Sequence, residues 1–92
     1  MKVRIIAFAS FREILGKEVE VDLTAGKTLR DLLGQLEEGH PRLHEEVYLP
    51  SGDLKETTII MLNRVNIDSK GGLDATLKEG DELAIFPPFA GG

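Results

Sequence analysis

The sequence predicts an α+β fold in which one main helix packs across one face of a mixed, four- to five-stranded sheet. Three observations predict it: an apolar, β-branched run at residues 2–9, a leucine stripe with helical spacing at residues 28–39, and a last apolar run at residues 82–86. A chain of 92 residues is the size of one domain. We therefore expect a single domain over residues 1–92 that ends in an extended tail, residues 87–92.

The first half of the chain predicts two strands that can form a hairpin. The run KVRIIAFA (residues 2–9) is apolar on both faces at its centre, which is typical of a central strand. The stretch SFREILG follows as a short helical or turn segment that ends at Gly16. Residues 17–23, KEVEVDL, then alternate acidic and apolar side chains, as a half-buried strand does.

A helix is predicted over residues 28–39, TLRDLLGQLEEG. Thr28 is a suitable N-cap, and Asp31 stands three positions later, as in a capping box. Gly39 and Pro41 indicate the end of the helix. The apolar stripe consists of four leucines at positions i, i+3, i+4 and i+7: Leu29, Leu32, Leu33 and Leu36.

The second half predicts two further strands joined by connectors. We expect residues 40–56 to be irregular, residues 57–63 (TTIIMLN) to form a strand, and residues 64–81 to be a connector with turns. The run ELAIF at residues 82–86 is the last strand, because the prolines that follow it cannot donate ladder hydrogen bonds. The order β-β-α-β-β, with the helix between two hairpin-like halves, is that of the ubiquitin-like β-grasp arrangement.

Composition excludes several classes of function. The net charge of −5 argues against nucleic acid or an anionic membrane as a partner and is compatible with docking onto a basic protein surface. The absence of cysteine excludes disulfides, a thiolate nucleophile and thiolate metal ligands. No apolar run approaches membrane-spanning length, and we expect a cytoplasmic protein.

The chain shows no constellation typical of an autonomous active site or a metal site. AGKT at residues 25–28 resembles the end of a phosphate-binding loop, but the glycine that this motif requires is replaced by Val21. His40 and His44 have helical spacing for two metal ligands, but Pro41 stands between them and no third ligand is evident. We expect neither a bound metal nor a cofactor on this chain.

The C-terminal stretch FPPFAGG is the most informative part of the sequence. Two prolines favour a stiff, extended spacer, and residues 87–92 can reach at most about 20 Å. Terminal glycines have no Cβ, so this end can thread a narrow channel in another protein. Gly92 ends in a carboxylate, which could serve as an acyl donor after a partner enzyme activates it.

Three stretches resemble the molybdopterin synthase small subunit, a member of the ubiquitin-like sulfur carrier family: LKEGDELAIFPPFAGG, FASFREILG and MLNRVNI. The resemblance is weakest at residues 40–56 and is closest to archaeal-type members, some of which also act as protein modifiers. It implies that an ATP-using activating enzyme adenylates Gly92, and that sulfur then converts it to a thiocarboxylate. The large synthase subunit would receive the tail and pass the sulfur to a pterin precursor of the molybdenum or tungsten cofactor.

Site residues follow partly from this resemblance and partly from strand parity. The resemblance assigns the sulfur to Gly92 and places the preceding residues against the partner: Pro87, Pro88, Phe89, Ala90 and Gly91. Parity predicts that Val3, Ile5, Leu83 and Ile85 face the helix. The opposite face would then present an apolar docking surface that includes Ile6, Phe8, Ala84 and Phe86.

The sequence leaves four functions open. The first is sulfur transfer in molybdopterin synthesis, in which the chain would be the carrier subunit of a sulfurtransferase. The second is a ubiquitin-like modifier joined to lysines through Gly92. The third is sulfur supply to tRNA thiolation or thiamine synthesis, and the fourth is an interaction domain with an inert tail.

Overall fold

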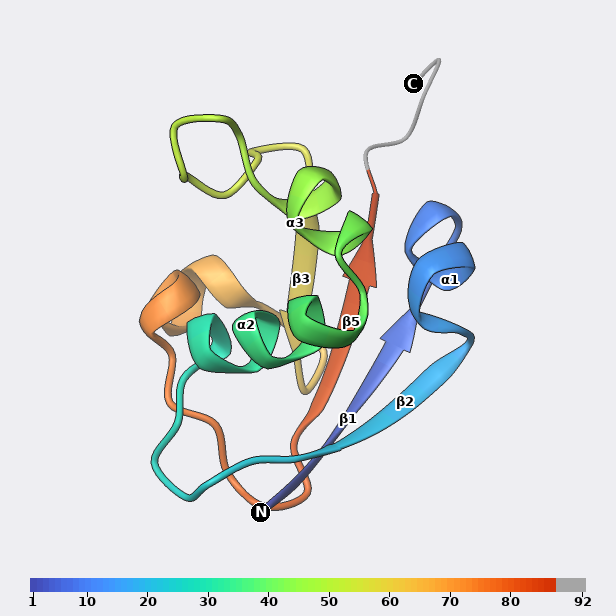
Figure 1. The fold of residues 1–92 in the computed structure, drawn as a ribbon. Helices are drawn as coiled ribbons and strands as arrows, with labels where there is room; N and C mark the ends of the chain where they lie inside the picture. Colours follow the sequence, from blue (N-terminus) through green and yellow to red (C-terminus); the bar gives the residue numbers. More distant parts are fainter. Residues whose placement is uncertain (88–92) are drawn as a thin grey trace.

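A computed structural model describes residues 1–87, and its framework is one mixed sheet with the strand order β2-β1-β5-β3-β4 (Figure 1). The two central strands, β1 and β5, run parallel, and every other neighbouring pair is antiparallel. This is the predicted mixed sheet with five strands. The strands are β1 (Lys2–Ala7), β2 (Glu18–Asp22), β3 (Ile59–Leu62), β4 (Val65–Asn66) and β5 (Glu82–Phe86).

The main helix packs on one face of this sheet, as predicted (Figure 1). It is the longest of the three α-helices within residues 1–87, and two short 3₁₀ turns follow β4. The helical elements are α1 (Ser10–Leu15), α2 (Leu29–Gly39), α3 (Arg42–Val47), η1 (Ile67–Lys70) and η2 (Gly72–Asp74). The first of them, α1, forms the connection of the β1–β2 hairpin. None of the helices in the described part of the chain is long and apolar enough to cross a membrane.

The predicted capping box begins α2. The Thr28 N–H donates to Asp31 Oδ2 at 2.9 Å, and the Asp31 N–H donates to Thr28 Oγ1 at 3.4 Å. These two bonds satisfy donors that the first helical turn leaves without a partner. All four leucines of the predicted stripe are buried against the sheet.

The core lies between α2 and the inner face of the sheet. Alternate residues of the two central strands are buried there, including Val3, Ile5, Leu83 and Ile85. The parity predicted for β1 and β5 is therefore confirmed. Burying each such side chain contributes about 1.5–3 kcal/mol relative to exposure, so strand register is strongly specified.

The prediction of irregular chain at residues 40–56 was wrong for its first part, which forms α3. Leu43 and Val47, four residues apart, point inward and are 0 % exposed. A helix of six residues contains only one such apolar pair, which is too short a pattern to predict a helix from sequence. Packing of this pair against the core stabilises a helix that would be marginal alone.

The predicted connector at residues 64–81 also contains structure that the sequence did not indicate. Leu62 pairs with Val65 across a two-residue turn, which places β4 at the edge of the sheet. Asn63 and Arg64 form this turn at φ 49° and 71°. Such turns usually contain glycine, and its absence here removed the signal for a hairpin.

The capping box predicts a pH-dependent contribution to stability. We expect Thr28→Ala to lower the free energy of unfolding by about 1 kcal/mol at neutral pH. Hydrogen bonds from the backbone and side chain of Thr28 hold the pKa of Asp31 below its ordinary value. Their contribution is present above the unfolded-state pKa of about 4 and is lost as pH falls through the lower folded-state pKa.

Urea unfolding at neutral and acidic pH measures this effect. The matched control is Thr24→Ala, which truncates an exposed threonine in the loop before the helix. Equal losses for the two variants at neutral pH, or a Thr28→Ala loss that stays constant down to pH 2, would contradict the interpretation.

The β3–β4 turn predicts opposite effects for two glycine substitutions. Arg64→Gly should raise the free energy of unfolding by a few tenths to about 1 kcal/mol, because glycine removes left-handed strain. Asn63→Gly should instead lower it by about 1–2 kcal/mol, because the Asn63 side chain donates to Asp81 Oδ1 and accepts from the Glu82 N–H, both at 2.9 Å. Denaturant unfolding of both variants tests the pair, and a gain in stability for Asn63→Gly would contradict it.

Candidate functional site

Four of the predicted site residues lie in the described part of the chain, near the ends of β1 and β5. Ile6 belongs to β1, Phe8 follows that strand, Phe86 ends β5, and Pro87 is the next residue. The remaining predicted site residues lie outside the described residues, so their assigned roles stay predictions. They are Pro88, Phe89, Ala90, Gly91 and Gly92.

The rings of Phe8 and Phe86 stack where β5 ends. Their centroids are 4.3 Å apart and their planes differ by 8°. The Phe8 N–H donates to Ile85 O at 3.2 Å, which continues the β1–β5 pairing beyond the last strand residue of β1. The Arg12 guanidinium lies 5.7 Å from the centre of the Phe8 ring, and its Nε donates to Ala7 O at 3.2 Å. The aromatic pair is therefore held by both backbone and side-chain contacts.

The stacked pair is part of a larger apolar surface on the face opposite α2. Each side chain in it is partly exposed, while its strand neighbours on the inner face are buried. We call this surface the outer patch, and it consists of Ile6, Phe8, Ile59, Met61, Ala84 and Phe86. Its exposure agrees with the predicted parity, and its role in docking stays a prediction.

Two members of the outer patch, Ile59 and Met61, were not predicted. They belong to β3 and pair directly with Phe86 and Ala84. The run TTIIMLN is apolar at every position from 59 to 62, so alternation alone does not show which residues face outward. Only the β3–β5 register assigns them to this face.

The other end of the outer face is charged. Arg4 of β1 lies between the two neighbouring strands, with its Nε 3.3 Å from Glu18 Oε1 and its Nη2 hydrogen-bonded to Glu82 Oε2. The hydrogen bond to Glu82 and the charge of Glu18 raise the pKa of Arg4. Lys2 continues the row, with its Nζ 3.5 Å from Glu20 Oε1. The outer face is thus apolar toward the end of β5 and ionic toward its start.

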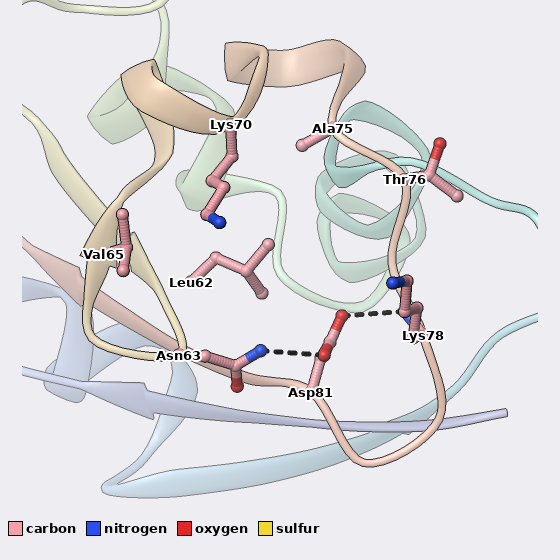
Figure 2. A pocket seen from close by; sticks show the side chains of 8 residues that line it. All are labelled: Leu62, Asn63, Val65, Lys70, Ala75, Thr76, Lys78 and Asp81. Atoms are coloured by element: carbon pink, nitrogen blue, oxygen red, sulfur yellow. Dashed lines mark hydrogen bonds between the residues drawn. The ribbon is translucent and has the colours of Figure 1, made fainter.

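A hollow of about 290 Å³ lies away from the outer patch, beside β4 and the 3₁₀ turns (Figure 2). The one carboxylate that lines this hollow, Asp81, already has two hydrogen-bond donors. It accepts from Asn63 Nδ2 at 2.9 Å and from the Lys78 N–H at 2.7 Å (Figure 2). A carboxylate with two such partners orders the turn into β5 and is not poised for acid–base chemistry. We therefore assign Asp81 a structural role and do not treat this hollow as a candidate active site.

The histidines raised as metal ligands do not come together in a cluster. His44 Nδ1 lies 3.1 Å from Glu37 Oε1, which ties α3 to α2. Within residues 1–87, no three His, Cys, Asp or Glu side chains are grouped to hold a metal ion. In the described part of the chain, the apolar outer patch is the feature that lies at the point where the tail begins.

The chain is similar to known proteins over nearly its whole length. The sequence profile of the ThiS family matches residues 5–92. Small archaeal modifier protein 3 of Haloferax volcanii is 31% identical over 97 aligned positions that cover 100% of both chains. The molybdopterin synthase sulfur carrier subunit of Chlamydomonas reinhardtii is 32% identical, also over 100% of both chains.

The fold has close counterparts among solved structures. The crystal structure of SAMP1 from Haloferax volcanii superposes with a TM-score of 0.86 at 31% identity, and the alignment covers 100% of each chain. The predicted ubiquitin-like β-grasp fold and the predicted family resemblance are both confirmed.

The partial exposure of the outer patch predicts that its aromatic pair contributes little to folding. Phe86→Ala should lower the free energy of unfolding by no more than about 1–2 kcal/mol, because the ring keeps contact with solvent. The matched control is Phe11→Ala, which should cost about 3–5 kcal/mol because Phe11 is fully buried. Denaturant unfolding of both variants measures the difference. A Phe86→Ala loss equal to that of Phe11→Ala would assign the stacked pair to the core.

Proposed function

Because this chain belongs to the ThiS family of ubiquitin-like sulfur carriers and modifiers, we propose that it carries sulfur on its C-terminal Gly92. The observation that supports this most directly is the family match, which continues to residue 92. The chain would have no active site of its own and would act as the sulfur-carrying subunit of a sulfurtransferase. Enzymes that act on Gly92 would supply the catalytic groups.

The proposed chemistry begins with activation, since a free carboxylate is a poor acyl donor. A Gly92 carboxylate oxygen attacks the α-phosphorus of ATP on an activating enzyme, and pyrophosphate leaves. A hydrosulfide equivalent then attacks the carbonyl carbon, a C–S bond forms, and AMP leaves with the former carboxylate oxygen. The product is a thiocarboxylate. ATP belongs to the activating enzyme, and we assign no cofactor to this chain.

The position of Pro87 supports the proposal that the catalytic groups belong to enzymes that bind this chain. The five residues that follow it can span at most about 17 Å, whatever their conformation. We therefore expect an enzyme that holds Gly92 in a buried active site to contact the surface around Pro87 as well. The outer patch begins there, at Phe86, and supplies the apolar area that such a contact requires.

We propose that the tail docks into the large subunit of molybdopterin synthase and delivers its sulfur to a pterin precursor held there. The support is the full-length similarity to the sulfur carrier subunit of that enzyme from Chlamydomonas reinhardtii. The thiocarboxylate sulfur would pass to a pterin precursor and form part of the dithiolene that binds molybdenum or tungsten.

A second function is supported by another relative. Small archaeal modifier protein 3 is named as a protein modifier and is similar over its full length. The same activated Gly92 could form an isopeptide bond with a lysine amine on a target protein, with loss of the activating group. The two functions share the activation step and differ in the nucleophile that follows it.

Intact mass spectrometry tests the shared chemistry. After incubation with ATP, a sulfide source and the activating enzyme of its host, the chain should gain the mass of one sulfur less one oxygen. Deletion of Gly92 should abolish this gain, because the terminal carboxylate of the shortened chain lies one residue, about 3.3 Å, short of the enzyme's active site. The control is a second carrier on which the same enzyme is shown to be active.

An unchanged mass with a competent activating enzyme would overturn the proposal of a sulfur carrier. A sulfur-loaded chain that binds the large subunit would favour the molybdopterin pathway. Isopeptide adducts without such binding would favour the modifier function.

A further inference from the structure

The chain has a loop at the end of the sheet where the tail begins, and no role was predicted for this loop. Residues 48–58 connect α3 to β3 (Figure 1). Ile59 pairs with Phe86 in the antiparallel register, so the chain enters β3 at the edge where β5 ends. Directly opposed residues of this kind lie about 5 Å apart, which places the base of the loop beside Phe86.

This loop has a defined shape because its backbone is hydrogen-bonded to itself. The Leu49 N–H donates to Asp53 O at 2.8 Å, and the Gly52 N–H donates to Leu49 O at 2.9 Å. Gly52 takes φ +93°, a conformation that glycine adopts without strain. Below this turn the Lys55 N–H donates to O of the buried Val47 at 2.9 Å, which anchors the loop to α3.

The turn presents an apolar side chain to solvent. Leu49 is 42% exposed, and among residues 1–87 the only other large apolar side chain with similar exposure is Val65, at 40%. Val65 lies in β4, which pairs with the opposite end of β3. Holding a leucine in a preformed turn lowers the ordering cost of placing it in a partner.

Acidic residues surround this leucine in the sequence. Between residues 42 and 56 the chain has four acidic residues (Glu45, Glu46, Asp53 and Glu56) and two basic ones (Arg42 and Lys55). A surface that complements this segment would combine an apolar depression with a rim of lysine or arginine.

We propose that the 48–58 loop is a second docking element, in which Leu49 enters an apolar, basic-rimmed depression on the activating enzyme. This inference rests on the proposed function. The activating enzyme is the partner common to the sulfur-carrier and modifier functions, and it must hold Gly92 within about 17 Å of Pro87. The loop base beside Phe86 lies inside that footprint.

The test compares two serine substitutions at equally exposed positions. Leu49→Ser should raise the KM of the activating enzyme for the chain about tenfold or more, because an apolar contact is lost, and should leave kcat nearly unchanged. Val65→Ser, at the other end of β3, should leave both constants unchanged. The readout is ATP-dependent pyrophosphate release at increasing concentrations of the chain.

Two further measurements separate docking from folding and charge. Leu49→Met should restore most of the wild-type KM, and circular dichroism should show that every variant is folded. Raising the salt concentration should raise the wild-type KM, because the basic rim is screened.

The possible outcomes distinguish the docking role of Leu49 from the proposed function of the chain. Normal activation of Leu49→Ser, or equal effects of Leu49→Ser and Val65→Ser, would overturn the docking role and leave the proposed function intact. Failure of the wild-type chain to be activated by a competent enzyme would overturn the proposed function, and this inference with it.

Discussion

The parallel pairing of β1 with β5 is the constraint on which the rest of the structure depends. It joins the first strand to the last at the centre of the sheet, with Ile5 opposite Leu83 and Ile6 opposite Ala84. Ile5 and Leu83 are both buried under α2, whereas Ile6 and Ala84 both belong to the outer patch. The same pairing sets Phe8 beside Phe86, so the point where the tail begins is supported by two strands.

The two ends of these strands carry different kinds of side chain. Toward the start of β5, Arg4 bridges acidic residues across three strands, and Asn63 ties the β3–β4 turn to Asp81. These polar contacts specify register without adding apolar surface. Toward the end of β5 the face becomes apolar, and the 48–58 loop leads into β3 at that same end. The polar contacts and the apolar outer patch thus lie at opposite ends of the same strands.

How much the sequence predicted depended on the length of each pattern. The helix α2 was predictable because its leucine stripe extends over two turns and a capping box precedes it. By contrast, α3 has a single apolar pair, Leu43 and Val47, and becomes helical because both side chains fit the core. The edge strand β4 follows a two-residue turn without glycine, which hid it. Strand parity predicted four of the six residues of the outer patch, and the two on β3 were not predicted.

The sequence by itself determined the elements whose signal is local. It specified the helix, the alternation of β2, the apolar runs of the central strands and the terminal Gly-Gly, because each depends on residues close together in the chain. Only the tertiary structure decided which side chains share a surface. Ile59 joins Phe86, and the 48–58 loop lies where the tail begins, because the β3–β5 register brings them together. Register depends on the packing of residues far apart in sequence, which no local pattern encodes.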